Sequence, residues 1–161
     1  MKIGVVSDTH NNLGNVREIV RLFNAARVER VVHTGDITKA KTLDVLAGLD
    51  APLYGVYGNN DVERETLEAS AVRHAFVFRD PPLELDWGGR RIVVVHDPWD
   101  LQHPSANQHD LALHGHTHMV RCERQDKTLI FNPGECAGHM KGYNAVGVVD
   151  LVTLDTALLK F

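Results

Sequence analysis

Four short segments of this sequence carry Asp, Asn or His side chains that are able to bind metal ions. They are Asp8-Thr9-His10, Gly35-Asp36, Gly58-Asn59-Asn60-Asp61 and His114-Gly115-His116-Thr117-His118. Each comes after a run of Val, Ile or Leu, and such a run is typical of a buried strand. The polar side chains are therefore expected at strand ends, where loops are able to gather them, and packing alone does not explain their repetition there.

The chemistry of these side chains points to a site for two cations. Asp8 and His10 are two residues apart, so a strand-end loop is able to direct both toward one ion, and His116 and His118 repeat this spacing. His96 follows a further apolar run and adds another imidazole. A mixed set of nitrogen and oxygen ligands without sulfur suits Mn, Fe, Ni, Zn or Co. The donors exceed the needs of one ion, which predicts two ions about 3.5–4 Å apart, bridged by a carboxylate and a water.

The segments that must position these side chains fall into two parts. In the first part, strands are predicted at 3–6, 31–32 and 53–57, and helices at 16–26, around 43–47 and at 62–71. In the second part, a strand is predicted at 110–113, and hairpins at 83–87 with 90–95, 120–124 with 128–131, and 145–151 with 156–161. Alternating strands and helices indicate parallel strands with crossover helices, whereas hairpin strands pair antiparallel.

The two patterns together predict an α/β fold in which two mixed β-sheets pack face to face, with helices on the outer faces, as a single domain over residues 1–161. Ligands of open α/β sheets bind beyond the carboxyl ends of the strands. The candidate ligands are therefore expected to converge on one rim, with the 98–110 loop as a further part of that rim. The other histidines, His74, His103, His109 and His139, are expected on the surface or in loops.

Charge and cysteine content exclude several classes of protein. The net charge is −4, so a general electrostatic grip on nucleic acid is not expected, and no stable nucleic-acid partner is predicted. Two cysteines are too few for a disulfide framework, and we expect both to be reduced. The N-terminal apolar run is too short for a signal peptide or a membrane span. We therefore predict a cytoplasmic protein without a membrane partner, and the sequence leaves a homo-oligomer open.

The ordered set of motifs resembles the calcineurin-like metallophosphoesterases. The resemblance rests on Asp8-x-His10, Gly35-Asp36, Gly58-Asn59-x-Asp61, His96 and Gly115-His116-Thr117-His118. The short chain and Asn132-Pro133-Gly134 after the last motif are similar to the small single-domain phosphodiesterase branch of bacteria and archaea. The resemblance implies a four-layer sandwich with helices outside two sheets. It also implies two divalent metal ions, with Mn as the first candidate and Ni, Fe, Zn or Co as alternatives.

The resemblance assigns a role to each motif residue. It implies that Asp8, His10 and His118 hold the first metal, that Asn59, His96 and His116 hold the second, and that Asp36 bridges the two. A hydroxide between the ions would then attack phosphorus in line with the leaving oxygen of a small phosphodiester. Three further side chains are not expected to bind metal. Asp61 is expected to support the ligands from behind or to cap the helix that follows it, and His33 and His114 are expected to support the ligands or to pack.

Two positions depart from the family pattern. Asn60 stands where relatives that cleave monoesters commonly have a histidine that is thought to protonate the leaving group, and an amide cannot act as a general acid. We therefore expect Asn60, beside Asp36, to act in catalysis by hydrogen-bonding a phosphoryl oxygen, and we predict a preference for diesters with good leaving groups. Asp97 stands where the family usually has glycine; it would either repel an anionic substrate or hydrogen-bond a metal-binding histidine, and the sequence leaves both readings open.

Three alternative functions compete with the phosphodiesterase prediction. A phosphomonoesterase is disfavoured by Asn60. A non-catalytic scaffold, as in a retromer subunit with the same fold and an impaired metal site, is disfavoured because the expected ligands are all present. A DNA-repair nuclease would be expected to have added DNA-contacting regions and a basic stripe, and this sequence has neither.

Overall fold

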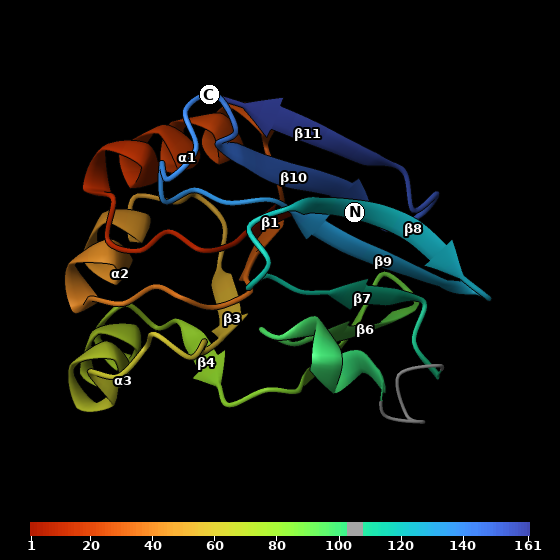
Figure 1. Ribbon diagram of the computed structural model, residues 1–161, viewed down its shortest axis with the longest axis horizontal. Helices are drawn as coiled ribbons and strands as arrows, with labels where there is room; N and C mark the ends of the chain where they lie inside the picture. Colours follow the sequence, from red (N-terminus) through yellow and green to blue (C-terminus); the bar gives the residue numbers. More distant parts are fainter. Residues whose placement is uncertain (103–107) are drawn as a thin grey trace.

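The computed structural model describes residues 1–102 and 108–161, so His103 of the predicted rim loop lies outside the described residues (Figure 1). The helices are α1 (Leu13–Ala26), α2 (Ala40–Leu46), α3 (Arg64–Arg73) and the 3₁₀ helix η1 (Pro98–Gln102). The strands are β1 (Lys2–Val6), β2 (Arg30–His33), β3 (Leu53–Val56), β4 (Val77–Arg79), β5 (Leu83–Trp87), β6 (Arg90–Val94), β7 (Leu111–Leu113), β8 (Val120–Gln125), β9 (Thr128–Pro133), β10 (Ala145–Asp150) and β11 (Thr156–Lys160).

The first sheet has the strand order β11-β10-β1-β2-β3-β4, and β1 to β4 run parallel within it. Strand β10 pairs antiparallel with β1, and β11 pairs antiparallel with β10. In the parallel register, Val6 of β1 lies opposite His33 of β2, and His33 lies opposite Gly55 of β3. The carboxyl ends of β1, β2 and β3 therefore reach the same edge of this sheet.

The second sheet repeats that arrangement with other strands. Its order is β5-β6-β7-β9-β8, in which β6, β7 and β9 are parallel and β5 and β8 are antiparallel edge strands. Val94, Leu113 and Phe131 lie in register across the three parallel strands. This sheet therefore has three parallel strands whose carboxyl ends lie side by side, against four parallel strands in the first sheet.

Successive side chains of a strand point to opposite faces of its sheet, so one strand packs against the layers on both sides. On β1, Ile3 and Val5 point into the apolar layer between the sheets, and Val6 points toward the helices. Helix α1 buries Val16, Ile19 and Phe23 in the helix-side layer. Each such side chain contributes roughly 1.5–3 kcal/mol when fully buried. The alternation thus ties β1 to both neighbouring layers at once.

The predicted sandwich of two mixed sheets is confirmed, and its outer layers are unequal. Helices α1, α2 and α3 stack along the outer face of the first sheet (Figure 1). On the outer face of the second sheet, Leu101 of η1 packs against Val93, Val95, Ala112 and Ile130. The other predicted elements are found with small changes at their ends, whereas β4 and η1 were not predicted.

Helix α1 begins at Leu13, three residues before the predicted start at residue 16. Asn12 caps it, because its side-chain oxygen accepts a hydrogen bond from the backbone N–H of Asn15 at 3.3 Å. Within the described part of the chain, no helix is long and apolar enough to cross a membrane.

Candidate metal centre

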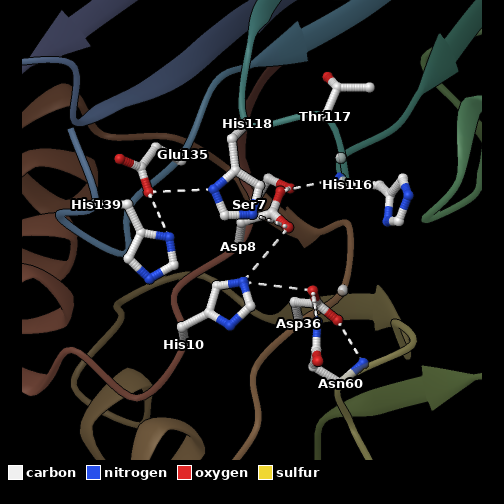
Figure 2. Close-up of polar contacts among 12 residues, drawn as sticks. Ser7, Asp8, His10, Asp36, Asn60, His116, Thr117, His118, Glu135 and His139 are labelled. Carbon is white, nitrogen blue, oxygen red and sulfur yellow. Dashed lines mark hydrogen bonds and ion pairs between the residues drawn. The ribbon is translucent and has the colours of Figure 1, made fainter.

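The carboxyl ends of six parallel strands, three from each sheet, meet at one rim. Strands β1, β2 and β3 lead into Asp8, Asp36 and Asn59. Strands β6 and β7 lead into His96 and the segment 114–118. All seven predicted ligands are brought together there, through the contacts described below. Asp8, His10, Asp36, His116 and His118 are drawn in Figure 2.

One half of the cluster is formed by Asp8, His10 and His118. Their ligand atoms all lie within 4.8 Å of one another. The Oδ1 atom of Asp8 is 3.4 Å from Nε2 of His118 and 3.9 Å from Nε2 of His10. Neither Oδ1 of Asp8 nor Nε2 of His10 has a hydrogen-bond partner among the described residues, although both atoms are buried. Buried polar atoms are rarely left without a partner, so this pair is open to a ligand.

The second half is formed by Asn59, His96 and His116. Oδ1 of Asn59 is 2.9 Å from Nε2 of His96 and 3.0 Å from Nδ1 of His116, and the two imidazole nitrogens are 3.3 Å apart. Nδ1 of His96 must carry its hydrogen, because it faces the backbone carbonyl oxygen of Thr34 at 2.9 Å. In neutral His96, Nε2 then carries a lone pair that faces Oδ1 of Asn59. A cation bound by these two atoms would use the lone pairs of both.

Asp36 lies between the two halves, with one oxygen on each side. Its Oδ2 is 3.4 Å from Nε2 of His10, and its Oδ1 is 3.5 Å from Nε2 of His96. Asp8, Asp36 and His96 form a further group whose ligand atoms lie within 4.8 Å of one another. A carboxylate in this position is able to contact cations in both halves.

Asn60 binds Asp36 directly. Its backbone N–H donates to Oδ1 of Asp36 at 2.9 Å, and its side-chain amide donates to Oδ2 at 2.7 Å. Figure 2 shows this pairing beside His10. The side-chain amide of Asn60 therefore lies at the cluster, in direct contact with Asp36.

Asp61 fixes the loops behind the cluster, as expected of a supporting residue. Its carboxylate accepts hydrogen bonds from the backbone N–H groups of Asp36 at 3.0 Å, Gly58 at 2.7 Å and Thr38 at 2.6 Å. Burial raises the pKa of Asp61, and the three backbone hydrogen bonds oppose that rise because they stabilise the charged form. One carboxylate thus ties the loop after β2 to the loop after β3.

His114 and His33 hold backbone groups behind the ligands. Nδ1 of His114 faces the carbonyl oxygen of Gly115 at 3.0 Å, and burial lowers the pKa of this imidazole. His33 accepts from the backbone N–H of Gly35 at Nδ1, 3.1 Å, so Nε2 carries the hydrogen and lies 3.1 Å from Oγ1 of Thr9. Burial lowers the pKa of His33 to about 3, so the ring is neutral near pH 7. Both contacts fit the predicted supporting role.

Asp97 lies on the outer side of His116. Its Oδ1 accepts from the backbone N–H of Trp99 at 2.9 Å, and its Oδ2 is 3.9 Å from Nε2 of His116. The other nitrogen of His116 faces Asn59. The 3.9 Å separation is an ion-pair contact between exposed side chains and is too long for the hydrogen bond that the supporting reading of Asp97 expects.

Five of the predicted ligands have a left-handed backbone conformation, with positive φ, that residues other than glycine rarely adopt. The φ angles are 50° at Asp8, 42° at His10, 58° at Asp36, 67° at His116 and 57° at His118. Left-handed backbone at a non-glycine residue costs on the order of 1–3 kcal/mol. Such strain concentrates at functional sites, and here it coincides with the residues that sequence spacing selected.

The electrostatics of the cluster fit a cation. Asp8, Asp36 and Glu135 are buried, and every ion pair that these three make within the described residues is to a histidine. Burial raises the pKa of Asp8, against the lowering effects of the Ser7 hydroxyl and of His96 and His118. Buried carboxylates without Lys or Arg are costly unless a cation compensates them. The residues present therefore suit divalent metal ions.

Two residues of this cluster were missed from the sequence. Glu135 follows β9 and is fully buried, with Oε2 3.3 Å from Nδ1 of His118. His139 is exposed in a loop, as predicted, but its contact with the cluster was not: its ring stacks on His118 at 5.3 Å between centroids. Glu135 lies at the rim because it follows β9, the third parallel strand of its sheet, and this pairing with β7 is a tertiary contact.

His109 lies in a loop before β7, in agreement with the prediction of a surface or loop position, and it is 7% exposed there. Its Nε2 lies 3.6 Å from Oε1 of Glu84, and its backbone carbonyl accepts from the Thr128 hydroxyl at 2.7 Å. Asp110 alone separates His109 from the start of β7 at Leu111.

Comparisons with known proteins agree with the resemblance inferred from the motifs. A family model described as the calcineurin-like phosphoesterase superfamily domain matches residues 1–154. The curated relative Phosphodiesterase MJ0936 from Methanocaldococcus jannaschii is 31% identical over 159 residues, which cover 93% of each chain. Phosphodiesterase YfcE from Escherichia coli K12 is 26% identical over 151 residues, 83% of this chain and 78% of that protein.

A solved structure has the same fold over the full length. It was described as that of a novel archaeal phosphodiesterase, and it superposes with a TM-score of 0.92 at 30% sequence identity, covering 100% of both chains.

Proposed function

This chain belongs to the calcineurin-like phosphoesterase superfamily, and on that premise we propose that it is a metal-dependent phosphoric diester hydrolase acting on a small phosphodiester. The relatives named as phosphodiesterases support the reaction class. The observation that carries the proposal is the position of Asp36, with one oxygen toward His10 and the other toward His96. That carboxylate joins two groups of ligand atoms into one site.

In this proposal the whole chain forms one catalytic domain with two metal positions. Asp8, His10 and His118 would hold one divalent ion, Asn59, His96 and His116 would hold the other, and Asp36 would contact both. Divalent ions in these positions would lower the pKa of water and offset the charge that develops on the phosphoryl group. Mn is the first candidate, and Ni, Fe, Zn or Co suit the same donors.

The protein's own groups determine how a phosphodiester would approach. Asp8 and Asp36 lie on the buried floor, whereas Asn59, Asn60 and His116 are exposed at the mouth. The substrate therefore enters from the side of the two asparagines and His116. The Asn60 amide, now bound to Asp36, is a neutral donor that would turn to a phosphoryl oxygen.

The lack of a titratable side chain at position 60 sets the expected substrate preference. An amide donates a hydrogen bond but does not transfer a proton near neutral pH. Loss of general acid catalysis typically costs about 10²–10⁴-fold, and poor leaving groups lose most. We therefore propose that diesters with good leaving groups are hydrolysed in preference to alkyl monoesters.

A metal-reloading experiment tests the proposal. The chelator-stripped protein is reloaded with Mn²⁺, Ni²⁺, Fe²⁺, Zn²⁺ or Co²⁺ and assayed against aryl and alkyl diesters, monoesters and cyclic nucleotides, with bound metal counted per chain. We expect diester hydrolysis to return only on reloading and to saturate at two ions per chain. Full activity without metal would refute the metal-dependent mechanism, monoester preference would favour the phosphomonoesterase alternative, and metal binding without hydrolysis of any ester would favour the scaffold.

The substrate preference is tested by Asn60→His, with Asn60→Ala as the matched control. The histidine variant supplies a general acid, so we expect its monoester rate to rise by about 10²-fold or more. The alanine variant loses the donor and gains no acid, so its monoester rate should not rise. Equal ratios of diester to monoester rate in all three proteins would refute the role given to position 60.

A further inference from the structure

Glu135 is a fully buried carboxylate that no step of the proposed reaction uses. Its Oε1 accepts a hydrogen bond from the backbone N–H of Met140 at 2.9 Å. Its Oε2 has no hydrogen-bond partner among the described residues. Oε2 lies 3.3 Å from Nδ1 of His118 and 3.8 Å from Nδ1 of His139, between the two rings (Figure 2).

The surroundings of Oε2 select an imidazole N–H as its partner. A buried carboxylate oxygen needs a donor, because the free energy cost of leaving it unpaired is high. The ion pairs of Glu135 in the described residues are to His118 and His139 only. The shorter of the two contacts is to His118, a predicted metal ligand, so this histidine is the better placed donor.

A donor at Nδ1 of His118 decides what its other nitrogen does. A neutral imidazole has one N–H and one lone pair. If Nδ1 donates to Glu135, the lone pair is on Nε2, which lies 3.4 Å from the unpartnered Oδ1 of Asp8. Carboxylates that accept the second N–H of a metal-binding histidine fix its tautomer and orientation in this way.

The ring of His139 lies against the ring of His118. The two rings are stacked with an interplanar angle of 4° and a centroid distance of 5.3 Å. The His139 ring also lies 5.3 Å from the ring of His10. The backbone of His118 has a φ of 57°, which is a strained conformation for a residue other than glycine. Glu135 contacts the edge of the His118 ring and His139 contacts its face.

We propose that Glu135 is a positioning residue, which holds His118 in the Nδ1–H tautomer and so directs the Nε2 lone pair to a metal ion beside Asp8. The inference rests on the proposed metal-dependent function and adds to it a residue outside the family motifs. His139 shares the same carboxylate and keeps the ring of His118 from turning away.

The informative substitution is Glu135→Gln. Met140 N–H still needs an acceptor, so the amide oxygen stays there and the NH₂ group faces His118. That group is a donor, which favours the Nε2–H tautomer of His118 and removes the lone pair from the metal side. Glu123→Gln is the matched control, because Glu123 is exposed and pairs with Arg121.

Nitrogen-15 NMR of histidine and chelator competition measure tautomer and metal affinity without turnover. In wild type and Glu123→Gln, with and without Zn²⁺, we expect the Nδ1–H signature for His118. In Glu135→Gln we expect the Nε2–H signature without metal and a Zn²⁺ affinity lower by about 10–100-fold. His139→Gln should keep the wild-type tautomer and lose less affinity than Glu135→Gln.

Several outcomes would overturn the proposal. An unchanged tautomer together with unchanged Zn²⁺ affinity in Glu135→Gln would do so. The Nε2–H signature for His118 in wild type would also overturn it. A third such outcome is that wild type binds an additional ion between His118, Glu135 and His139 and that Glu135→Gln loses this ion. If the wild type binds no metal, the proposed function fails, while the tautomer comparison still decides the role of Glu135. Melting curves of all variants show whether a lost signature reflects unfolding.

Discussion

The carboxylate of Asp44 and that of Asp8 are held in opposite ways in two regions of the molecule. Asp44 lies at the junction of α2 and α3, where its Oδ1 accepts from the Ser70 hydroxyl, the Arg73 guanidinium and the His74 imidazole at 2.9, 2.5 and 2.9 Å. These hydrogen bonds lower the pKa of Asp44 to about 2. Burial instead raises the pKa of Asp8 at the rim.

The difference separates a carboxylate that supports the fold from one that serves a site. Asp44 has three donors in partial contact with solvent, and its charge links two helices. Asp8 is fully buried, and one of its oxygens has no hydrogen-bond partner in the described chain. The rim therefore carries an energetic cost that the helix junction does not, and a bound cation is what would offset it.

The largest expected effect follows from Asp8→Asn. The amide is a weaker ligand, so we expect diesterase activity in saturating Mn²⁺ to fall by about 10²–10³-fold. The same change removes a buried charge, so the metal-free protein should melt at a higher temperature than wild type. Paired kinetic and calorimetric measurements check both halves. Lower stability of the metal-free variant would show that the Asp8 charge is already compensated by the protein.

Gly115→Ala probes how tightly the rim is packed. A Cβ there would clash with Oγ of Ser7 and would lie 2.8 Å from Oδ2 of Asp8, so the loop must shift. We expect a loss of about 1–3 kcal/mol in the free energy of unfolding, together with weaker metal binding. Gly14→Ala in α1 is the control, since among the described residues its Cβ would meet only Oδ1 of Asn12, at 3.6 Å, and the change should stabilise the protein. Urea denaturation of both variants gives the comparison, and equal values would argue against a tightly packed rim.

His33 predicts a dependence of stability on pH. Its pKa is about 3 in the folded protein and 6.5 in the reference state, so between these values the unfolded chain binds a proton that the folded chain does not. Stability should therefore fall as pH decreases from 6.5 toward 3, by at most about 1.4 kcal/mol per pH unit from this group. In His33→Asn, whose amide oxygen is able to accept from Gly35, the slope from pH 6 to 4 should be shallower. A slope equal to that of wild type would contradict the prediction.

Asp44→Asn should have the smallest effect. Because Asp44 is 43% exposed, solvent screening reduces its interactions, and we expect a loss of about 0.5–1 kcal/mol at pH 7 with unchanged diesterase activity. The folded pKa lies below the ordinary value of 3.8, so this contribution is present above pH 4 and is lost as pH falls toward 2. Chemical denaturation at pH 7 and pH 2.5 measures it. A change in activity would mean that the helix junction and the rim are coupled.

Much of this architecture was predictable because the strands that carry the site are strongly patterned. Apolar runs such as Ile3–Val6 and Ile92–Val95 predict strands that end where the run ends, and the polar residues after them identify the rim. Strand β4 was missed because Val77–Arg79 is short and has no fully buried residue. It forms because β3 offers it a parallel partner, and that information lies elsewhere in the chain.

The parts of the site that escaped prediction depend on tertiary contacts. Glu135 follows a turn at Gly134, and nothing in its own neighbours shows that it is buried beneath two imidazoles. Asn60 was expected to face a phosphoryl group, but its bond to Asp36 requires the register of β2 and β3. Spacing identifies which residues converge, whereas burial and hydrogen-bond direction follow from how the sheets pack.

The division of the ligands between two sheets has a thermodynamic consequence. Asp8, Asp36 and Asn59 come from one sheet, and His96, His116 and His118 come from the other. An ion bound by residues of both sheets would link the two sheets, so unfolding that separates the sheets must release the ion. Cation concentration then becomes a control on global unfolding through mass action, with a gain of about 2.7 kcal/mol when the free ion is at a hundred times its dissociation constant.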